Sequence, residues 1–175
     1  RRTPRQVSRP VPDPTRKTVS ATQVAMMFNV SPYGTRWMLW QHFKHGISID
    51  LEPNERMEIG KLLQPAILRL AADALRLEVT ANADDQYARH ATLPLGCTVD
   101  ATVRCPERGL GVVEAKNVDA MIFRSAWTEK AAPRHIELQT QAQMTVLGTS
   151  WGVIAALVGG NTLKLYERRP LPKVQ

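Results

Sequence analysis

The chain has 175 residues, enough for one domain with a substantial hydrophobic core but too few for two. It is 43% hydrophobic and 22% charged, the composition of an ordinary folded domain. Its two cysteines, Cys97 and Cys105, are too few for a disulfide scaffold, and no run of about 18 apolar residues is present that would span a membrane. These features argue against a disulfide-rich secreted protein and an integral membrane protein, and they predict a cytoplasmic protein without a membrane partner.

The net charge of +7 favours an anionic partner, with nucleic acid first and an acidic membrane surface second. Residues 1–19 contain six basic residues and one acidic residue, a net charge of +5 that leaves only +2 for the rest. Four prolines interrupt this segment, so we expect an extended basic arm over residues 1–18 and a single domain over residues 19–175. The arm either follows a phosphate backbone or is a solvated tail, and the charge alone does not establish DNA binding.

Capping residues and apolar spacing predict three helices in the first half of the chain, over residues 20–28, 35–46 and 53–75. The third begins with a proline, a residue that suits the first turn of a helix. The second contains Trp37 and Trp40, which we expect to build core rather than to stack on bases.

The second half of the chain alternates strands with a helix. Four strands are predicted, joined in pairs by glycine-containing turns, at residues 95–103, 110–116, 151–158 and 162–166. A helix from Pro133 to Gly148 separates the two pairs. This order of elements predicts an α/β (α+β) fold with one mixed central sheet flanked by helices.

Three charged residues fall on the first pair of strands. Side chains two apart on a strand point to the same side, so Glu114 and Lys116 project together, and Asp100 on the neighbouring strand can converge on them. Two carboxylates beside an ammonium group suit Mg²⁺ or Mn²⁺, which prefer oxygen ligands. A metal of this kind activates water and neutralises a phosphodiester while Lys116 positions or deprotonates the nucleophile, which is the chemistry of a metal-dependent nuclease.

The alternative to this interpretation is a Glu–Lys pair that faces solvent on an amphipathic strand, because a Glu-x-Lys tripeptide is short enough to arise by chance. The protein would then be a structural or partner-binding module.

The predicted helix after Pro133 carries three glutamines. Gln139 and Gln143 are four residues apart and share a helix face, where their amides can orient water or phosphate oxygens. For Gln141 we expect a solvent-facing position, and for His135 a surface or capping role.

Taken together, five stretches resemble the YqaJ-type viral recombinases, relatives of phage lambda exonuclease within the PD-(D/E)xK nuclease superfamily. In chain order they are Ser20–Ala25 with Ser31–Tyr33, Leu39–Trp40 with Lys44–Gly46, Ile59–Ala66, Thr98–Asp100 with Glu114–Lys116, and Gln139–Met144 with Gly148. The order of five weak motifs over residues 19–169 is more specific than any single motif.

The resemblance implies a restriction-endonuclease-like fold and a Mg²⁺-dependent 5′→3′ exonuclease, with Mn²⁺ as a substitute metal. It would act on the ends of linear double-stranded DNA in a bacterial host cell and leave 3′ single-stranded tails for a single-strand annealing protein. The resemblance also implies a homo-oligomer, a trimer. The implied metal ligands are Asp100, Glu114 and the backbone carbonyl of Ala115. Lys116 is the implied catalytic lysine, and Gln139 is the implied catalytic glutamine that supports the water or the scissile phosphate, with Gln64 and Gln143 in supporting positions.

The implied DNA contacts are hydroxyls and an arginine that hold the 5′-phosphate. Ser20 and Thr98 fit the hydroxyl positions, and Arg124 is the candidate arginine. The sequence departs from the family at Gln64, where relatives commonly have an active-site glutamate. An amide keeps the hydrogen-bonding shape of the carboxylate but removes a charge, which weakens metal binding. The alternative function is therefore a non-catalytic or weakly active relative that binds DNA ends.

Overall fold

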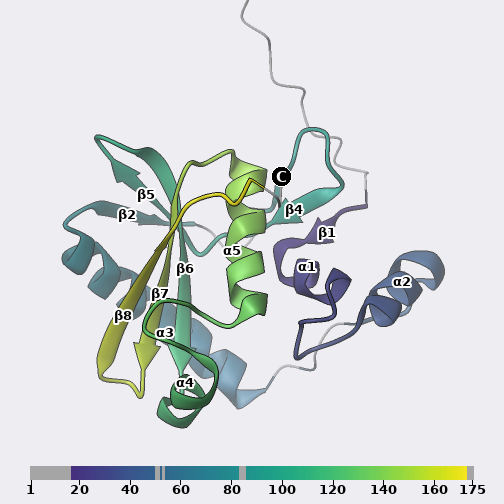
Figure 1. The fold of residues 1–175 in the computed structure, drawn as a ribbon, viewed down its shortest axis with the longest axis horizontal. Coiled ribbons are helices and arrows are strands. Elements are labelled where there is room, and N and C mark those ends of the chain that lie inside the picture. Colours follow the sequence, from purple (N-terminus) through teal and green to yellow (C-terminus); the bar gives the residue numbers. More distant parts are fainter. Residues whose placement is uncertain (1–16, 50–51, 53, 83–85, 173–175) are drawn as a thin grey trace, which may run out of the picture.

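The structure, a computed structural model, describes residues 17–49, 52, 54–82 and 86–172 (Figure 1). Most of the predicted basic arm, and Pro53 at the predicted start of the third helix, lie outside the described residues. No helix in the described part of the chain has the length and apolar composition needed to cross a membrane.

A five-stranded mixed sheet forms the centre of the molecule. Its strand order is β2 (Glu78–Ala81), β5 (Ala101–Cys105), β6 (Gly109–Val118), β7 (Gly152–Val158) and β8 (Thr162–Arg168). Within this sheet as described, β6 and β7 are the only parallel neighbours. The helices α4 (Ala120–Ala126) and α5 (Arg134–Leu147) connect these two strands. The sequence of β7 is entirely apolar and nearly all of it is buried, as expected for a central strand that is covered on both faces.

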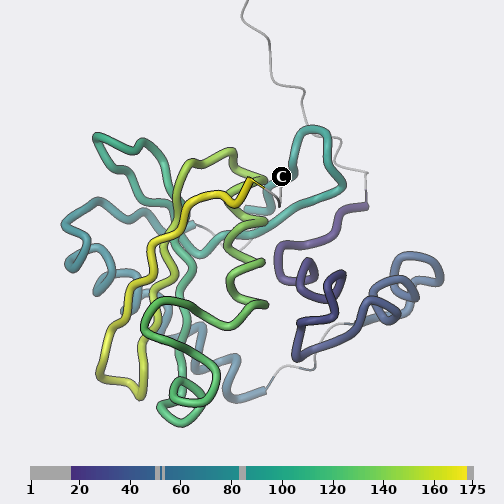
Figure 2. Tube along the Cα trace, in the orientation of Figure 1, coloured from purple at the N-terminus to yellow at the C-terminus, as the bar shows by residue number. Residues whose placement is uncertain are grey.

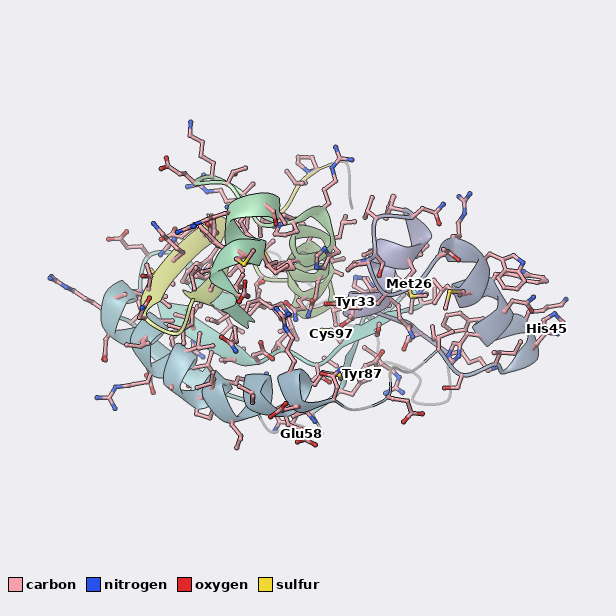
Figure 3. The ribbon with its side chains drawn as sticks, turned by 90° about the horizontal axis from the view of Figure 1, so that it is seen from below. Met26, Tyr33, His45, Glu58, Tyr87 and Cys97 are labelled. Atoms are coloured by element: carbon pink, nitrogen blue, oxygen red, sulfur yellow. The ribbon has the colours of Figure 1, made fainter. Side chains whose placement is uncertain are left out.

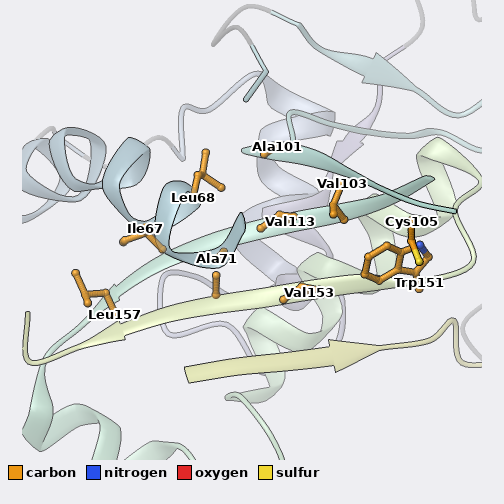
Figure 4. Close-up of a cluster of buried hydrophobic side chains, with 11 residues drawn as sticks. Ile67, Leu68, Ala71, Ala101, Val103, Cys105, Val113, Trp151, Val153 and Leu157 are labelled. Atoms are coloured by element: carbon orange, nitrogen blue, oxygen red, sulfur yellow. The ribbon is translucent and has the colours of Figure 1, made fainter. Parts of the chain in front are cut away.

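Helices cover both faces of this sheet (Figure 1). The long helix α3 (Glu55–Leu75), which Asn54 caps, packs Ile67, Leu68 and Ala71 against Val113 and other core residues of the sheet (Figure 4). Helix α5 lies on the opposite face, and α1 (Ala21–Met27) packs on the far side of α5 (Figure 2). Helix α5 therefore lies between the sheet and α1, with little of its surface left for solvent. The mixed sheet flanked by helices confirms the predicted fold class.

The first pair of predicted strands differs from the structure, because the strand expected over residues 95–103 is two strands in two sheets. The chain leaves a small sheet, in the order β1 (Val19–Ser20), β4 (Leu95–Cys97) and β3 (Ala88–Arg89), and enters the large sheet at Ala101. Cys97, Val99, Ala101 and Val103 are all buried. Alternation therefore continues through the change of sheet, and the prediction of a single sheet is wrong.

The helical pair α1–α2 has the predicted ends but not the predicted core. A capping box at Ser20 starts α1, and Thr35 caps α2 (Arg36–His45), which ends at Gly46 in the left-handed conformation. The expectation that the tryptophans of α2 build core is wrong, because Trp37 is 64% exposed and Trp40 52% exposed. Helix α2 projects beyond α1 at the edge of the molecule, so most of its surface has no neighbouring layer to pack against (Figure 2).

Candidate active site

Strand β6 places Glu114 and Lys116 on the face that α5 covers. The two side chains point to the same side, as their spacing predicts, and Lys116 Nζ donates to Glu114 Oε1 at 2.5 Å. Glu114 is 2% exposed, whereas the Lys116 side chain is 28% exposed. A charge buried to this degree is stable only when it is paired and hydrogen-bonded. The prediction that these residues share a face is confirmed, and the alternative of a pair that faces solvent does not describe Glu114.

The other partners of Glu114 come from α5. Gln139 Nε2 donates to Glu114 Oε1 and Gln143 Nε2 donates to Oε2, both at 2.6 Å. Lys116 Nζ is also 3.4 Å from Gln139 Oε1, so one network joins the ammonium group, the carboxylate and the two amides. The spacing of four residues on one helix face, which singled out Gln139 and Gln143, brings both amides to the same carboxylate.

Asp100 reaches this network from the link between the two sheets. Strand β5 begins at Ala101, which is paired with Val113, so β6 continues beyond this end of its neighbour. The Ala115 N–H donates to Asp100 Oδ2 at 2.7 Å, in the place where a longer strand would supply a carbonyl. Because the N–H and C=O of one strand residue point to the same edge, the Ala115 carbonyl also lies on the Asp100 side of β6.

The charges at the site are coupled. Burial opposes the charged form of Lys116, but the charge and hydrogen bond of Glu114 and the charge of Asp100 more than offset it, so the pKa of Lys116 is raised. Burial, with a contribution from the Glu114 charge, raises the pKa of the nearby Cys97 thiol to about 12, which keeps it neutral. Two carboxylates therefore face one ammonium group, an excess of negative charge that favours a cation.

The oxygen donors at the site fit a hard divalent cation. The available set is the carboxylates of Asp100 and Glu114 and the backbone carbonyl of Ala115, with the Gln139 amide oxygen close by. Across the described ranges, no group of three or more His, Cys, Asp and Glu side chains is placed to hold a metal ion. An all-oxygen set with two charges suits Mg²⁺ or Mn²⁺, which keep several water ligands. It differs from structural zinc sites, whose ligands are mainly the nitrogen and sulfur atoms of His and Cys.

A cleft of about 530 Å³ opens beside Lys116 and Gln139. Its other walls come from α1, the α1–α2 turn, α4 and the first turns of α3 and α5, and they include Thr22, Ser31, Tyr33, Arg56, Ile122 and His135. A second hollow of about 510 Å³ shares Tyr33 and Arg56 with the first and extends to Ser20. Figure 3 shows Tyr33 between the α1–α2 pair and the body of the molecule. The site therefore continues into a groove between the α1–α2 pair and the sheet.

The remaining predicted residues lie at different distances from this network. Thr98 is exposed in the link beside Asp100, and its backbone carbonyl accepts a hydrogen bond from Gln143 Nε2 at 3.4 Å. Arg124 is exposed in the last turn of α4, a helix whose residues Ile122 and Ala126 line the cleft. Gln64 is half-buried on α3, the helix that covers the opposite face of the sheet from α5.

Sequence reasoning misplaced Gln141 and did not foresee the contact that His135 makes. Gln141 does not face solvent, because it is 4% exposed and its amide bonds Arg169 O and the Leu171 N–H of the C-terminal segment. His135 lines the cleft, where its ring meets that of Tyr33 edge-to-face with 6.1 Å between centroids. Burial, with a contribution from Lys116, lowers the pKa of His135. No local pattern pairs His135 with Tyr33, because they are about a hundred residues apart in the chain.

Comparisons with known proteins give the family of the chain and similar folds. Residues 14–150 match the YqaJ-like viral recombinase domain. The alkaline exonuclease LHK-Exo from Laribacter hongkongensis, in its complex with dAMP, has a similar structure, with a TM-score of 0.66 and 17% identity over 90% of this chain and 80% of that one. A phage-related exonuclease from Haemophilus somnus is similar with a TM-score of 0.56 and 10% identity, over 78% of this chain and 70% of that one. Comparison with curated protein sequences finds no match.

Proposed function

Because the chain belongs to the family of YqaJ-like viral recombinase domains, we propose that it is a metal-dependent exonuclease of phage-type recombination. The observation that carries the proposal is the buried carboxylate of Glu114, which Lys116, Gln139 and Gln143 hold beside Asp100 at one end of a cleft. The proposed substrate is the end of linear double-stranded DNA. The enzyme removes 5′-mononucleotides in the 5′→3′ direction and leaves 3′ single-stranded tails.

We assign the metal site to Asp100, Glu114 and the backbone carbonyl of Ala115. Mg²⁺, or Mn²⁺ in its place, would there activate a water molecule and neutralise charge on the scissile phosphodiester. Gln143 fixes the orientation of the Glu114 carboxylate, because its amide occupies Oε2 and leaves Oε1 directed toward Lys116 and Gln139. The ammonium group of Lys116 and the amide of Gln139 then orient the attacking water or a phosphate oxygen.

Contacts to the DNA backbone would come from the groove between the α1–α2 pair and the sheet. The Ser20 hydroxyl accepts the Gln23 N–H as the cap of α1 and retains its own proton to donate to a phosphate. Thr98 supplies a second exposed hydroxyl beside Asp100, and Arg124 supplies a positive charge near the cleft. Arg56, which lines both hollows, is a second candidate for the arginine that holds the terminal phosphate.

The family resemblance supports two further parts of the proposal. A homotrimer would enclose the duplex and keep a small enzyme on its substrate. A single-strand annealing protein would take up the 3′ tails in the host cytoplasm.

Digestion of a labelled duplex tests the function. A linear duplex with a 5′-phosphate, labelled at either its 5′ or its 3′ end, is incubated with Mg²⁺ or EDTA and with the parent or Lys116→Ala. We expect Mg²⁺-dependent release of the 5′ label as mononucleotide and a loss of about a hundredfold or more in the variant, the scale at which positioned proton donors act. Lys164→Ala, which removes an exposed lysine from β8 of the same sheet, is the matched control and should digest normally.

A DNA-end-binding protein without nuclease activity is the second candidate, and Gln64 is the observation that favours it. With an amide in place of the family's glutamate, the site has two carboxylates to hold a metal. This candidate predicts that Mn²⁺ does not raise the melting temperature, since a ligand stabilises the folded state only when it binds there. End binding without digestion in Mg²⁺ or Mn²⁺ would establish it, and Gln64→Glu would then be expected to restore digestion.

A further inference from the structure

An aromatic corner of the cleft has no role in the proposed hydrolysis, because the hydrogen bonds that join Glu114, Lys116, Gln139, Gln143 and Asp100 do not include Tyr33 or His135. We propose that Tyr33 and His135 form the site that holds the base of the terminal nucleotide while that nucleotide is removed, an inference that rests on the proposed function. This assigns the recognition of a base to one end of the cleft and the cleavage of the backbone to the other.

The position of the two rings is the first argument. Both line the cleft that Lys116 and Gln139 close, and both lie near enough to Lys116 to interact with its charge. A nucleotide whose phosphodiester lies at Lys116 therefore has its base within reach of this corner. The cleft volume of about 530 Å³ falls within the roughly 300–1,000 Å³ of small-molecule sites.

The shape of the corner is the second argument. The rings meet edge-to-face at 89°, so they form two walls at a right angle. Tyr33 is 55% exposed, and buried Trp127 and Ile136 complete the apolar lining. An exposed aromatic face beside apolar side chains binds the π-face of any base, which a nuclease without sequence preference requires.

The backbone on either side fixes the two rings before any substrate arrives. Tyr33 follows a proline, and its N–H donates to Ser31 Oγ at 3.1 Å within the α1–α2 turn. His135 lies in the first turn of α5, two residues after the Pro133 cap. The terminal base pair of a duplex is also the pair that opens at least cost, which allows one base to leave the stack and enter the corner.

A duplex that ends in an abasic residue tests this proposal. Release of the first nucleotide is measured under single-turnover conditions on two substrates, which differ only in whether the 5′-terminal residue carries a base. We expect the parent to prefer the substrate with the base, and Tyr33→Leu to reduce that preference about tenfold, the scale of losing one base–aromatic stack. Tyr33→Phe retains the ring and should retain the preference. Trp37→Leu, an exposed aromatic of α2 away from the cleft, is the matched control.

Three results would overturn the base site. The first is that the parent releases the terminal nucleotide from both substrates at the same rate. The second is that Tyr33→Leu slows release from both substrates by the same factor, as expected if the ring pair only holds the α1–α2 turn against α5. The third is that Tyr33→Phe behaves like Tyr33→Leu.

A binding measurement separates this proposal from the nuclease itself. Calorimetry with each deoxynucleoside 5′-monophosphate and with deoxyribose 5-phosphate needs no turnover. We expect all four nucleotides to bind more tightly than the sugar phosphate, with the difference reduced about tenfold in Tyr33→Leu. Equal binding of nucleotide and sugar phosphate by the parent refutes the base site even if the enzyme digests DNA. A preserved preference in a protein that digests nothing supports the base site and refutes the exonuclease.

Discussion

Helices α5 and α2 differ in how much of their surface is buried and in whether polar side chains are included. Helix α5 buries three polar residues, Thr140, Gln141 and Gln143, whereas α2 buries only Leu39 and exposes two tryptophans. The difference follows from their places in the fold, because α5 lies between the sheet and α1 while α2 has a neighbour on one side only (Figure 1). Burial therefore depends on the surrounding layers as much as on the polarity of the helix.

The polar residues of α5 are tolerated inside because each has a partner. Thr140 bonds the Ile136 carbonyl within the helix, Gln143 bonds Glu114, and Gln141 bonds the C-terminal segment. A buried polar group without a partner costs about 1–3 kcal/mol. These hydrogen bonds offset that cost for each residue, although Gln143 Oε1 is buried without a partner among the described residues. The glutamines of α5 thus differ in what they hold, since Gln139 and Gln143 bond the Glu114 carboxylate and Gln141 bonds the C-terminal segment at Arg169 and Leu171.

The largest effect is expected when the internal partner of the carboxylate is removed. Gln143→Leu leaves Glu114 Oε2 without its amide donor in a buried position. We expect a loss of about 1–3 kcal/mol of stability, which lowers the melting temperature by several degrees in a domain of this size. We also expect a loss of at least about tenfold in digestion rate, because the freed carboxylate no longer keeps one orientation. Thermal denaturation by circular dichroism and the duplex assay measure the two effects.

Gln141→Leu is the second test and the matched control for the first. Gln141 lies two residues before Gln143 on the same helix. Its substitution removes the hydrogen bonds to Arg169 O and Leu171 N and leaves Glu114 untouched. We expect a loss of about 1 kcal/mol with an unchanged digestion rate. If both variants lost activity equally, the division of α5 into a catalytic and a structural glutamine would be wrong.

Local patterns predicted most of the fold and the centre of the site. Caps and apolar spacing located the ends of α2 and α5, and the spacings of two on a strand and four on a helix brought Glu114, Lys116, Gln139 and Gln143 to one face. Neither pattern depends on distant parts of the chain.

The features that sequence analysis missed depend on contacts between distant segments. The alternation of buried residues continues from Cys97 to Val103 although the chain changes sheet, so only tertiary pairing shows that Asp100 lies in a link. Strand β2 is a four-residue edge strand and α4 a seven-residue helix, and each is too short for a clear period. The edge-to-face pair of Tyr33 and His135 likewise has no local signal.

The third prediction concerns the first turn of α5. The pKa of His135 is lowered in the folded protein by burial and then by the charge of Lys116, so the unfolded chain binds a proton here more readily. The contribution of neutral His135 to stability is therefore present above the ordinary histidine pKa of about 6.5, and it is lost as the pH falls through that range. We expect His135→Gln to lose less stability than the parent between pH 7.5 and 5.5. Melting temperatures across this range measure the difference, and parallel curves for the two proteins would contradict the prediction.

The smallest effect is expected on the exposed face of α2. Trp37 is 64% exposed, so Trp37→Ser removes little buried area and should change stability by no more than about 0.5 kcal/mol. Leu39 on the same helix is buried, and Leu39→Ala should cost about 2 kcal/mol or more. Urea denaturation of both variants compares the two positions directly. A large loss in Trp37→Ser alone would mean that this tryptophan is covered in solution, and that α2 has a neighbouring layer after all.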